Sequence, residues 1–367
     1  MKYKLSDVVD RINGNVDRFT TSLEYYVGGE HFESNELEIT GCGLIKPNVN
    51  ILGFKFHFAF QPGDVLYMAR NPHLRKAGMV NFSGICSDAS YILRTKDSNV
   101  LCQEYLAVIM QSNHLWDYCE SHKVGSVNFA INWKTLANYE FDLPDINIQR
   151  SIANRIWAAY RVKQAYKKLI SATDEMVKSQ FIEWFGNVTE TTSLSSLIAE
   201  SYPGEWGKEA KNNNGVKVLR TTNFQNNGHI DYSDVIVRYI EQKKIEKKCL
   251  RTGDIILERS GGTKDNPVGR VVLFEAEGEY MFNNFTQLLR PIKSVNPYYL
   301  FFYLHTSYNA DKASMRAMAS QTTGIQNLNM TDYMAKEIPL PSLEEQEQFE
   351  RLYRQADKSK YYEINET

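Results

Sequence analysis

The sequence predicts an α+β chain of two similar domains, each mixing strands and helices, separated by long helices that form an antiparallel two-helix coiled coil. Two observations support this prediction. The segment Gly63–Arg70 returns 190 residues later as Gly253–Ser260, a period far longer than that of solenoid repeats, so each copy is a whole domain. The segment from Ile148 to Phe185 contains no Pro or Gly. At 367 residues and 43% hydrophobic, the chain can build two globular units.

Further landmarks repeat in the same order around these two segments. The matched residues are mostly apolar or Gly, whereas the residues between them differ. One scaffold therefore carries two different recognition surfaces, which predicts a two-part target. The matched pairs are Tyr26–Phe32 with Val218–Phe224, Glu104–Leu106 with Tyr298–Leu300, and Leu143-Pro144 and Gln149 with Leu340-Pro341 and Gln346.

Each repeat begins with strands and ends with helices. Val65–Met68 and Ile255–Leu257 are short apolar runs that follow Gly-Asp turns, and we expect buried strands there. Asn226-Asn227-Gly228 is a turn signal between strands. The apolar runs 105–110 and 298–304 each follow a polar stretch and predict buried helices.

The segment between the repeats predicts one long helix. Its apolar residues recur mostly every three or four positions, as in a coiled coil, and Gly186-Asn187 supplies a stop. At 1.5 Å per residue the helix would be about 57 Å long. The seam consists of Ile148, Ile152, Ile156, Ala159, Val162, Tyr166, Leu169, Val177, Phe181 and Trp184.

A helix beginning at Leu343 is the predicted partner of this long helix. Residues 150–185 hold seven Lys or Arg against three acids, whereas residues 344–367 hold seven acids against four bases. Opposite charges favour pairing of the two helices, although the C-terminal helix is shorter. The alternative is that each helix packs only on its own domain. The predicted division is 1–145 and 188–341 for the domains, with 146–187 and 342–367 for the helices.

Composition excludes some classes of protein and leaves others open. The net charge of −2 neither indicates nor excludes nucleic-acid binding, because a local basic face suffices. Five cysteines without Cys-x-x-Cys spacing predict free thiols in a reducing cytoplasm. No apolar run of 18 residues occurs, so we expect no membrane association.

The sequence contains no catalytic motif that we recognise. Asn296-Pro297-Tyr298 lacks the second Pro of an adenine-methyltransferase loop, and no Walker lysine or Gly-rich cofactor loop occurs. Glu246-Lys247-Lys248 lies in a Lys-rich run and predicts a solvated surface. The seven His have no metal-ligand spacing. We therefore expect no catalytic, cofactor-binding or metal-binding residue in this chain.

Four motifs, in order and over nearly the whole chain, resemble the specificity subunit of type I restriction-modification systems. The first repeat departs from the pattern at Ser126–Phe129 and at Asp145–Asn147. The motifs are Tyr26-Val27-Gly28-Gly29-Glu30-His31, Gly253–Leu257 followed by Ser260-Gly261-Gly262 and Gly269-Arg270-Val271, Thr323-Gly324-Ile325-Gln326-Asn327-Leu328, and Ile338-Pro339-Leu340-Pro341 with Glu344, Gln346 and Glu347.

The resemblance implies a non-catalytic, cytoplasmic, prokaryotic subunit that reads a bipartite, asymmetric sequence in double-stranded DNA. It further implies two modification subunits that methylate adenine N6 with S-adenosylmethionine, and two ATP- and Mg-dependent restriction subunits. These cofactors would sit in the partners. The alternatives are part of a fused or stand-alone DNA methyltransferase or nuclease with an unrecognised catalytic site, and a scaffold that binds only protein.

Polar loops beside the repeated strands are the predicted DNA contacts, because loops on rigid scaffolds commonly carry function. The segment 220–223 of the second repeat matches residues 28–31 of the first. The candidate residues are Arg70, Asn71, His73, Arg75 and Lys76 in the first domain, and Arg220, Thr221, Thr222, Asn223, Arg259, Ser260, Thr263, Lys264, Gln321, Thr322 and Thr323 in the second.

Overall fold

The computed structural model describes residues 2–45, 52–126, 128–210, 215–322 and 324–361, without the side chains of residues 321, 322 and 358–361. The chain forms two compact units, residues 1–167 and 168–367. The division falls inside the long helix α5 (Ile146–Phe185), so each unit is described by itself below.

Unit 1 contains two four-stranded sheets, ordered β4-β3-β8-β5 and β2-β9-β6-β7, and a small β1-β10 pair. The first sheet contains one parallel pair, β3 with β8. The strands of unit 1 are β1 (Lys2–Lys4), β2 (Val9–Ile12), β3 (Tyr25–Val27), β4 (Gly43–Leu44), β5 (Phe56–Phe60), β6 (Val65–Met68), β7 (Ala77–Met79), β8 (Gly84–Ser87), β9 (Ser90–Thr95) and β10 (Glu140–Asp142). Its helices before α5 are α1 (Leu5–Val8), α2 (Gln103–Ile109), α3 (Asn113–His122) and α4 (Trp133–Ala137), with short 3-10 turns η1 (Gly29–His31) and η2 (Pro72–Leu74).

Unit 2 repeats this plan with sheets ordered β13-β15-β14-β19 and β12-β20-β16-β18, a β11-β23 pair and an added sheet, β17-β22-β21. Here too one pair is parallel, β14 with β19. The strands are β11 (Thr191–Ser193), β12 (Ile198–Glu200), β13 (Lys208–Glu209), β14 (Val216–Leu219), β15 (Ile236–Tyr239), β16 (Ile255–Glu258), β17 (Ser260–Gly261), β18 (Val271–Leu273), β19 (Tyr280–Phe282), β20 (Thr286–Pro291), β21 (Ala319–Thr322), β22 (Ile325–Leu328) and β23 (Glu337–Pro339). The helices are α6 (Gln242–Lys248), α7 (Pro297–Ala310), α8 (Lys312–Ala317), α9 (Met330–Met334) and α10 (Leu343–Tyr361), with η3 (Leu194–Leu197) and η4 (Thr221–Asn223).

The repeated Gly-Asp turn has the same structural role in both units. Gly63 and Gly253 have φ of 90° and 92°, which glycine adopts without strain. The buried carboxylate that follows each glycine accepts two hydrogen bonds from one arginine. Arg94 donates to Asp64 at 2.8 and 3.0 Å, and Arg290 donates to Asp254 at 2.8 Å twice. The motif therefore ties two neighbouring strands together, β6 to β9 and β16 to β20.

The repeated glutamine has an equally definite role at the start of each long helix. Gln149 and Gln346 are both buried. Gln149 accepts from the backbone N–H of Cys102 and donates to the carbonyl of Pro144. Gln346 accepts from the N–H of Asn296 and donates to the carbonyl of Pro341. Each amide thus joins the Leu-Pro entry of its helix to the loop before an earlier helix of the same unit.

The N-terminal part of α5 is held to unit 1 by a buried carboxylate. Lys163 and Lys167 both contact Glu36 at 2.9 Å, and Gln164 donates to its other oxygen. Burial opposes ionisation, but the hydrogen bonds from Lys167 and Lys163 lower the pKa of Glu36 below its ordinary value. These two lysines were expected to attract the acidic C-terminal helix. Instead, their positive charges hold the helix on its own domain.

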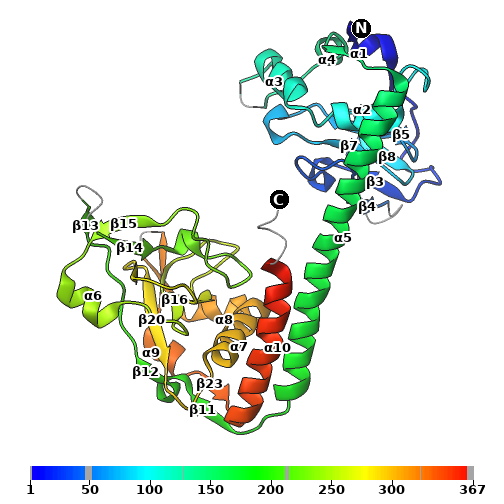
Figure 1. The fold of residues 1–367 in the computed structure, drawn as a ribbon. Helices are drawn as coiled ribbons and strands as arrows, with labels where there is room; N and C mark the ends of the chain where they lie inside the picture. Colours follow the sequence, from blue (N-terminus) through cyan, green and yellow to red (C-terminus); the bar gives the residue numbers. More distant parts are fainter. Residues whose placement is uncertain (1, 46–51, 127, 211–214, 323, 362–367) are drawn as a thin grey trace. The chain divides into compact units, whose positions relative to one another are not determined.

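The C-terminal part of α5 pairs with α10 inside unit 2. The two helices run antiparallel, side by side (Figure 1). The ring of Phe349 packs against Phe181 and Phe185, with centroids 4.9 and 6.0 Å apart. All three side chains belong to one buried core that also includes residues of α7. The expected pairing of the two helices is confirmed, over the C-terminal part of α5.

The predicted apolar seam of α5 divides into buried and exposed parts. Val177 and Phe181 are buried, whereas Ile148, Val162 and Leu169 are 52%, 69% and 59% exposed. The seam is therefore not buried along its whole length. Helix α10 covers its C-terminal part, which agrees with the shorter length expected for the C-terminal helix.

Candidate nucleic-acid interface

Three of the predicted segments of the second domain come together in unit 2. Strand β17 pairs with β22 of the hairpin 319–328, and Ser260 is registered with Asn327. The hydroxyl of Ser260 donates to Oδ1 of Asn327 at 2.8 Å. Ser260 is buried, so its hydroxyl joins the loop to the hairpin and does not face solvent.

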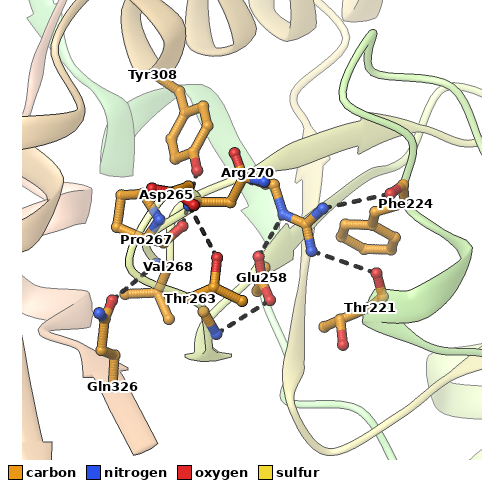
Figure 2. Close-up of polar contacts among 12 residues, drawn as sticks. Thr221, Phe224, Glu258, Thr263, Asp265, Pro267, Val268, Arg270, Tyr308 and Gln326 are labelled. Atoms are coloured by element: carbon orange, nitrogen blue, oxygen red, sulfur yellow. Dashed lines mark hydrogen bonds and ion pairs between the residues drawn. The ribbon is translucent and has the colours of Figure 1, made fainter. Parts of the chain in front are cut away.

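An ion pair between Glu258 and Arg270 connects the loop after β16 to the turn η4 (Figure 2). Arg270 Nε donates to Glu258 at 2.7 Å, and the two side chains are 17% and 3% exposed. The same guanidinium donates to the backbone carbonyls of Thr221 and Phe224 at 3.3 Å. Glu258 also accepts a long hydrogen bond, 3.4 Å, from the N–H of Gly262. This pair therefore fixes two predicted reading segments relative to each other.

The tip of the loop after β16 carries the exposed candidates of this segment. Thr263 and Lys264 are exposed, and Arg259 is half-buried. The Thr263 hydroxyl accepts from the N–H of Asn266, which shapes the turn. Arg259 reaches Gln287 at 3.3 Å. The loop thus carries two cations, the half-buried Arg259 and the exposed Lys264.

The turn η4 holds the candidates Arg220–Asn223. Asn223 is 3% exposed and accepts from the N–H of Arg220 at 2.9 Å, while its amide donates to two carbonyls of the loop 231–234. In unit 1, His31 accepts from the N–H of Gly28 at 2.9 Å in the same way. The match between these segments is therefore a shared turn. The side chain of Asn223 maintains that turn, which leaves Thr221, Thr222 and Arg220 toward the surface.

The hairpin β21-β22 holds the remaining candidates of the second domain. Gln321 and Thr322 lie on β21, in register with Gln326 and Ile325, and Thr323 lies outside the described residues. The Gln326 side chain accepts from the N–H of Val268 at 3.3 Å, as Figure 2 shows. The hairpin is thereby attached to the loop after β16.

The candidates of the first domain lie on one strained loop. Asn71 and Arg75 flank η2 and have φ of 52° and 48°, a left-handed conformation that residues other than glycine seldom adopt. Arg70 and His73 are exposed. Lys76 donates to the carbonyl of Gly29 at 2.8 Å, so this loop contacts the turn η1, just as the loop after β16 contacts η4. Strain of this kind is commonly kept at functional loops.

Sequence reasoning missed two aromatic residues beside these loops. Trp206 and Phe285 are 39% and 37% exposed, and the carbonyl of Phe285 accepts from the N–H groups of both Arg259 and Ser260. Asn283-Asn284 between two apolar runs is a turn signal that could have drawn attention to Phe285. Nothing in the local sequence distinguishes Trp206 from a core residue.

The arrangement offers hydrogen-bond donors, amides and apolar rings on loops held by a rigid scaffold. These are the groups that contact phosphates and base edges. Within the described ranges, no cluster of three His, Cys, Asp or Glu side chains could hold a metal ion.

The family described as type I restriction modification DNA specificity domain matches residues 1–171 and 200–358. The chain belongs to this family. The two matched ranges correspond to the two copies of the fold, each with the helix that follows it, so the type I specificity domain occurs here in tandem. The expected fold class is confirmed.

The chain is also similar to individual proteins. A type I restriction enzyme MjaX specificity subunit from Methanocaldococcus jannaschii is 27% identical over 171 residues, which cover 46% of this chain and 39% of that relative's length. The type I restriction-modification system S subunit from M. genitalium matches over 98% of this chain and 90% of its own, with a TM-score of 0.62 and 11% identity, and shows the same fold. An HsdS subunit from Thermoanaerobacter tengcongensis is 18% identical, with a TM-score of 0.39 and cover of 98% and 89%.

Among the described residues, every helix is too short or too polar to cross a bilayer.

Proposed function

We propose that this chain reads a bipartite, asymmetric sequence in double-stranded DNA as the specificity subunit of a type I restriction-modification complex. The observation that carries the proposal is the pair of like scaffolds with unlike loops. In both η1 and η4 the backbone N–H before the turn donates to the side chain of its last residue. Yet η1 carries Gly28, Gly29 and Glu30 where η4 carries Arg220, Thr221 and Thr222. Each domain would read one half of the target. Joining the two readers in one chain raises affinity when both halves are present.

Within the proposal, the chain has no catalytic role. Two modification subunits bind S-adenosylmethionine and methylate adenine N6, and two restriction subunits use ATP and Mg in the cytoplasm of a prokaryote. Support for protein partners comes from α5, on which Leu169, Met176 and Ile182 are 59%, 49% and 58% exposed. Large apolar side chains repeated along one exposed helix are typical of a surface that another protein covers.

Exchanging residues 188–341 for the second domain of another family member tests the two-reader proposal. Methylation mapping of host DNA should show one half of the methylated sequence changed and the other half retained. A change in both halves would contradict independent reading. If neither the wild-type nor the exchanged chain gave methylation although its complex assembled, the proposed function would be contradicted.

Arg259→Ala tests the contact proposed for the loop after β16. If the guanidinium reads a base, specific binding should weaken by about 1–3 kcal/mol, with little change on random DNA. Lys293→Ala is a matched control, because Lys293 is an exposed cation that follows β20 in the same unit. Equal losses on specific and random DNA would make Arg259 a phosphate contact.

A further inference from the structure

A hollow of about 380 Å³ lies in unit 2 beside the turn η4. It is lined by the aromatic rings Trp206 and Phe285, by Thr221 and Thr222, by Arg220 and by the amide of Asn284. Its wall is built from three stretches of chain that are far apart in the sequence. One of them, η4, is itself a predicted reading segment, and another, the turn 283–285, contacts Arg259 and Ser260 of a second one.

Both aromatic rings are held in place by the backbone around them. The turn 283–285 joins β19 to β20, and the carbonyl of Phe285 accepts from the N–H groups of Arg259 and Ser260 at 2.9 and 3.0 Å. Before Trp206, a Cβ on Gly204 would lie 2.1 Å from the carbonyl oxygen of Asn283, so only glycine fits there. The N–H of Glu205 donates to the carbonyl of Phe282 at 2.8 Å. The two rings are therefore exposed on rigid supports.

Two arginine side chains lie beside the aromatic rings of the hollow. The guanidinium of Arg238 lies 4.6 Å from the centre of the Trp206 ring. Arg220 borders the hollow, oriented by a 2.8 Å ion pair with Asp234. Arginine side chains beside apolar rings suit a polyanion that presents an apolar group, and suit an apolar protein surface less well.

We propose that this hollow reads one A·T base pair in the major groove, with the thymine 5-methyl group against Phe285 and Trp206. The Asn284 amide, next to Phe285, is the complementary contact to adenine N6 and N7. Apolar contact with the thymine methyl and an asparagine amide on adenine are the side-chain pairings that suit these bases. The inference rests on the proposed function and adds a specificity-determining set of residues to it.

Replacing single thymines by deoxyuridine tests the inference without disturbing the protein. DNA duplexes are made with the target sequence that methylation mapping identifies, and deoxyuridine replaces each thymine in turn. Binding of these duplexes by the complex of this chain with its modification subunits is measured by gel shift. One replacement should weaken wild-type binding about fourfold, the worth of one methyl group. Phe285→Ala should bind more weakly overall and lose that discrimination, and Phe285→Leu should keep part of it. Leu343→Ala, with an equally exposed apolar side chain (40%) on α10, should discriminate like wild type.

Three results would overturn the inference. The first is a target in which no thymine replacement weakens wild-type binding. The second is a methyl effect that persists in both Phe285→Ala and Trp206→Ala. The third is a Phe285→Ala chain that fails to assemble with the modification subunits, which would make the hollow a protein-docking surface. Failure of the proposed function is distinguishable from all three, because wild-type complex would then bind target and random DNA equally.

Discussion

Glu258→Gln should destabilise unit 2 and loosen the loops that we propose contact DNA. The substitution keeps the size of the side chain but removes its negative charge. Arg270, 17% exposed, then loses the one carboxylate that the structure places on its guanidinium, at 2.7 Å. The carbonyls of Thr221 and Phe224 remain as acceptors, at 3.3 Å.

The expected loss is about 3 kcal/mol of the free energy of unfolding. Breaking a buried ion pair by removing one partner costs roughly 3–5 kcal/mol, because the other charge stays buried and unpaired. The lower end applies here since Arg270 keeps two carbonyl acceptors and some solvent contact. Removing both charges in Glu258→Gln with Arg270→Gln should cost less than the two single losses added together, with a coupling of roughly 1–3 kcal/mol.

Denaturant unfolding of the four chains, wild type, both single variants and the double variant, measures these losses. Hydrogen exchange of peptides from β16 to β18 assigns the change to unit 2, and peptides from β6 to β9 serve as the internal control. In the Glu258→Gln chain, amides of residues 259–264 should exchange faster. A loss below 1 kcal/mol, or single losses that simply add in the double variant, would refute the reasoning.

The remaining predictions concern the two long helices. Glu36→Gln should destabilise unit 1 above the ordinary Glu pKa of 4.5. Because the folded pKa of Glu36 is lowered, its stabilising contribution should shrink as the pH falls below 4.5 and vanish once the pH is below the folded pKa. Wild type and variant should therefore converge in acid unfolding, and a constant difference in stability would contradict the ion-pair account. Gln346→Leu should cost about 2–3 kcal/mol in denaturant unfolding, because the Asn296 N–H and the Pro341 carbonyl lose their buried partner; Gln355→Leu, an exposed position on the same helix, should cost almost nothing. Seven residues inserted near Ser171-Ala172-Thr173 should lengthen α5 by about 10 Å and the gap of the methylated motif by about three base pairs. The bases read should not change, since the insertion leaves the contacts of Lys163 and Phe181 in place, and altered bases with an unchanged gap would disprove the spacer role.

Local patterns in the sequence were enough to predict the architecture. The Gly-Asp repeat, the Leu-Pro and Gln repeat and the stretch without Pro or Gly each depend on short-range physics. A turn needs a glycine with positive φ, a helix needs an uninterrupted run of helix formers, and a buried strand needs a run of apolar residues. The structure has these elements at β6, β16, α2, α7, α5 and α10, within a few residues of their predicted bounds.

The tertiary structure alone decided what individual polar side chains do. Asn223 and Ser260 are polar residues of the kind that contact bases. Yet both are buried, and their side chains make hydrogen bonds that hold the loops. The lysines of α5 were expected to face α10, yet Lys163 and Lys167 contact Glu36, more than 100 residues away. Which faces of an amphipathic helix become buried depends on partners brought together by folding, and periodicity alone does not specify those partners.

The hollow at Phe285 illustrates the same division. Its residues come from positions 206, 220–222 and 283–285, and no window of sequence contains them together. Asn283-Asn284 is a turn signal in the sequence, and Phe282 and Phe285 flank it. Only the packing of β19, η4 and the strand β16 decided that two rings and an amide would share one surface, because that packing depends on contacts distant in the sequence.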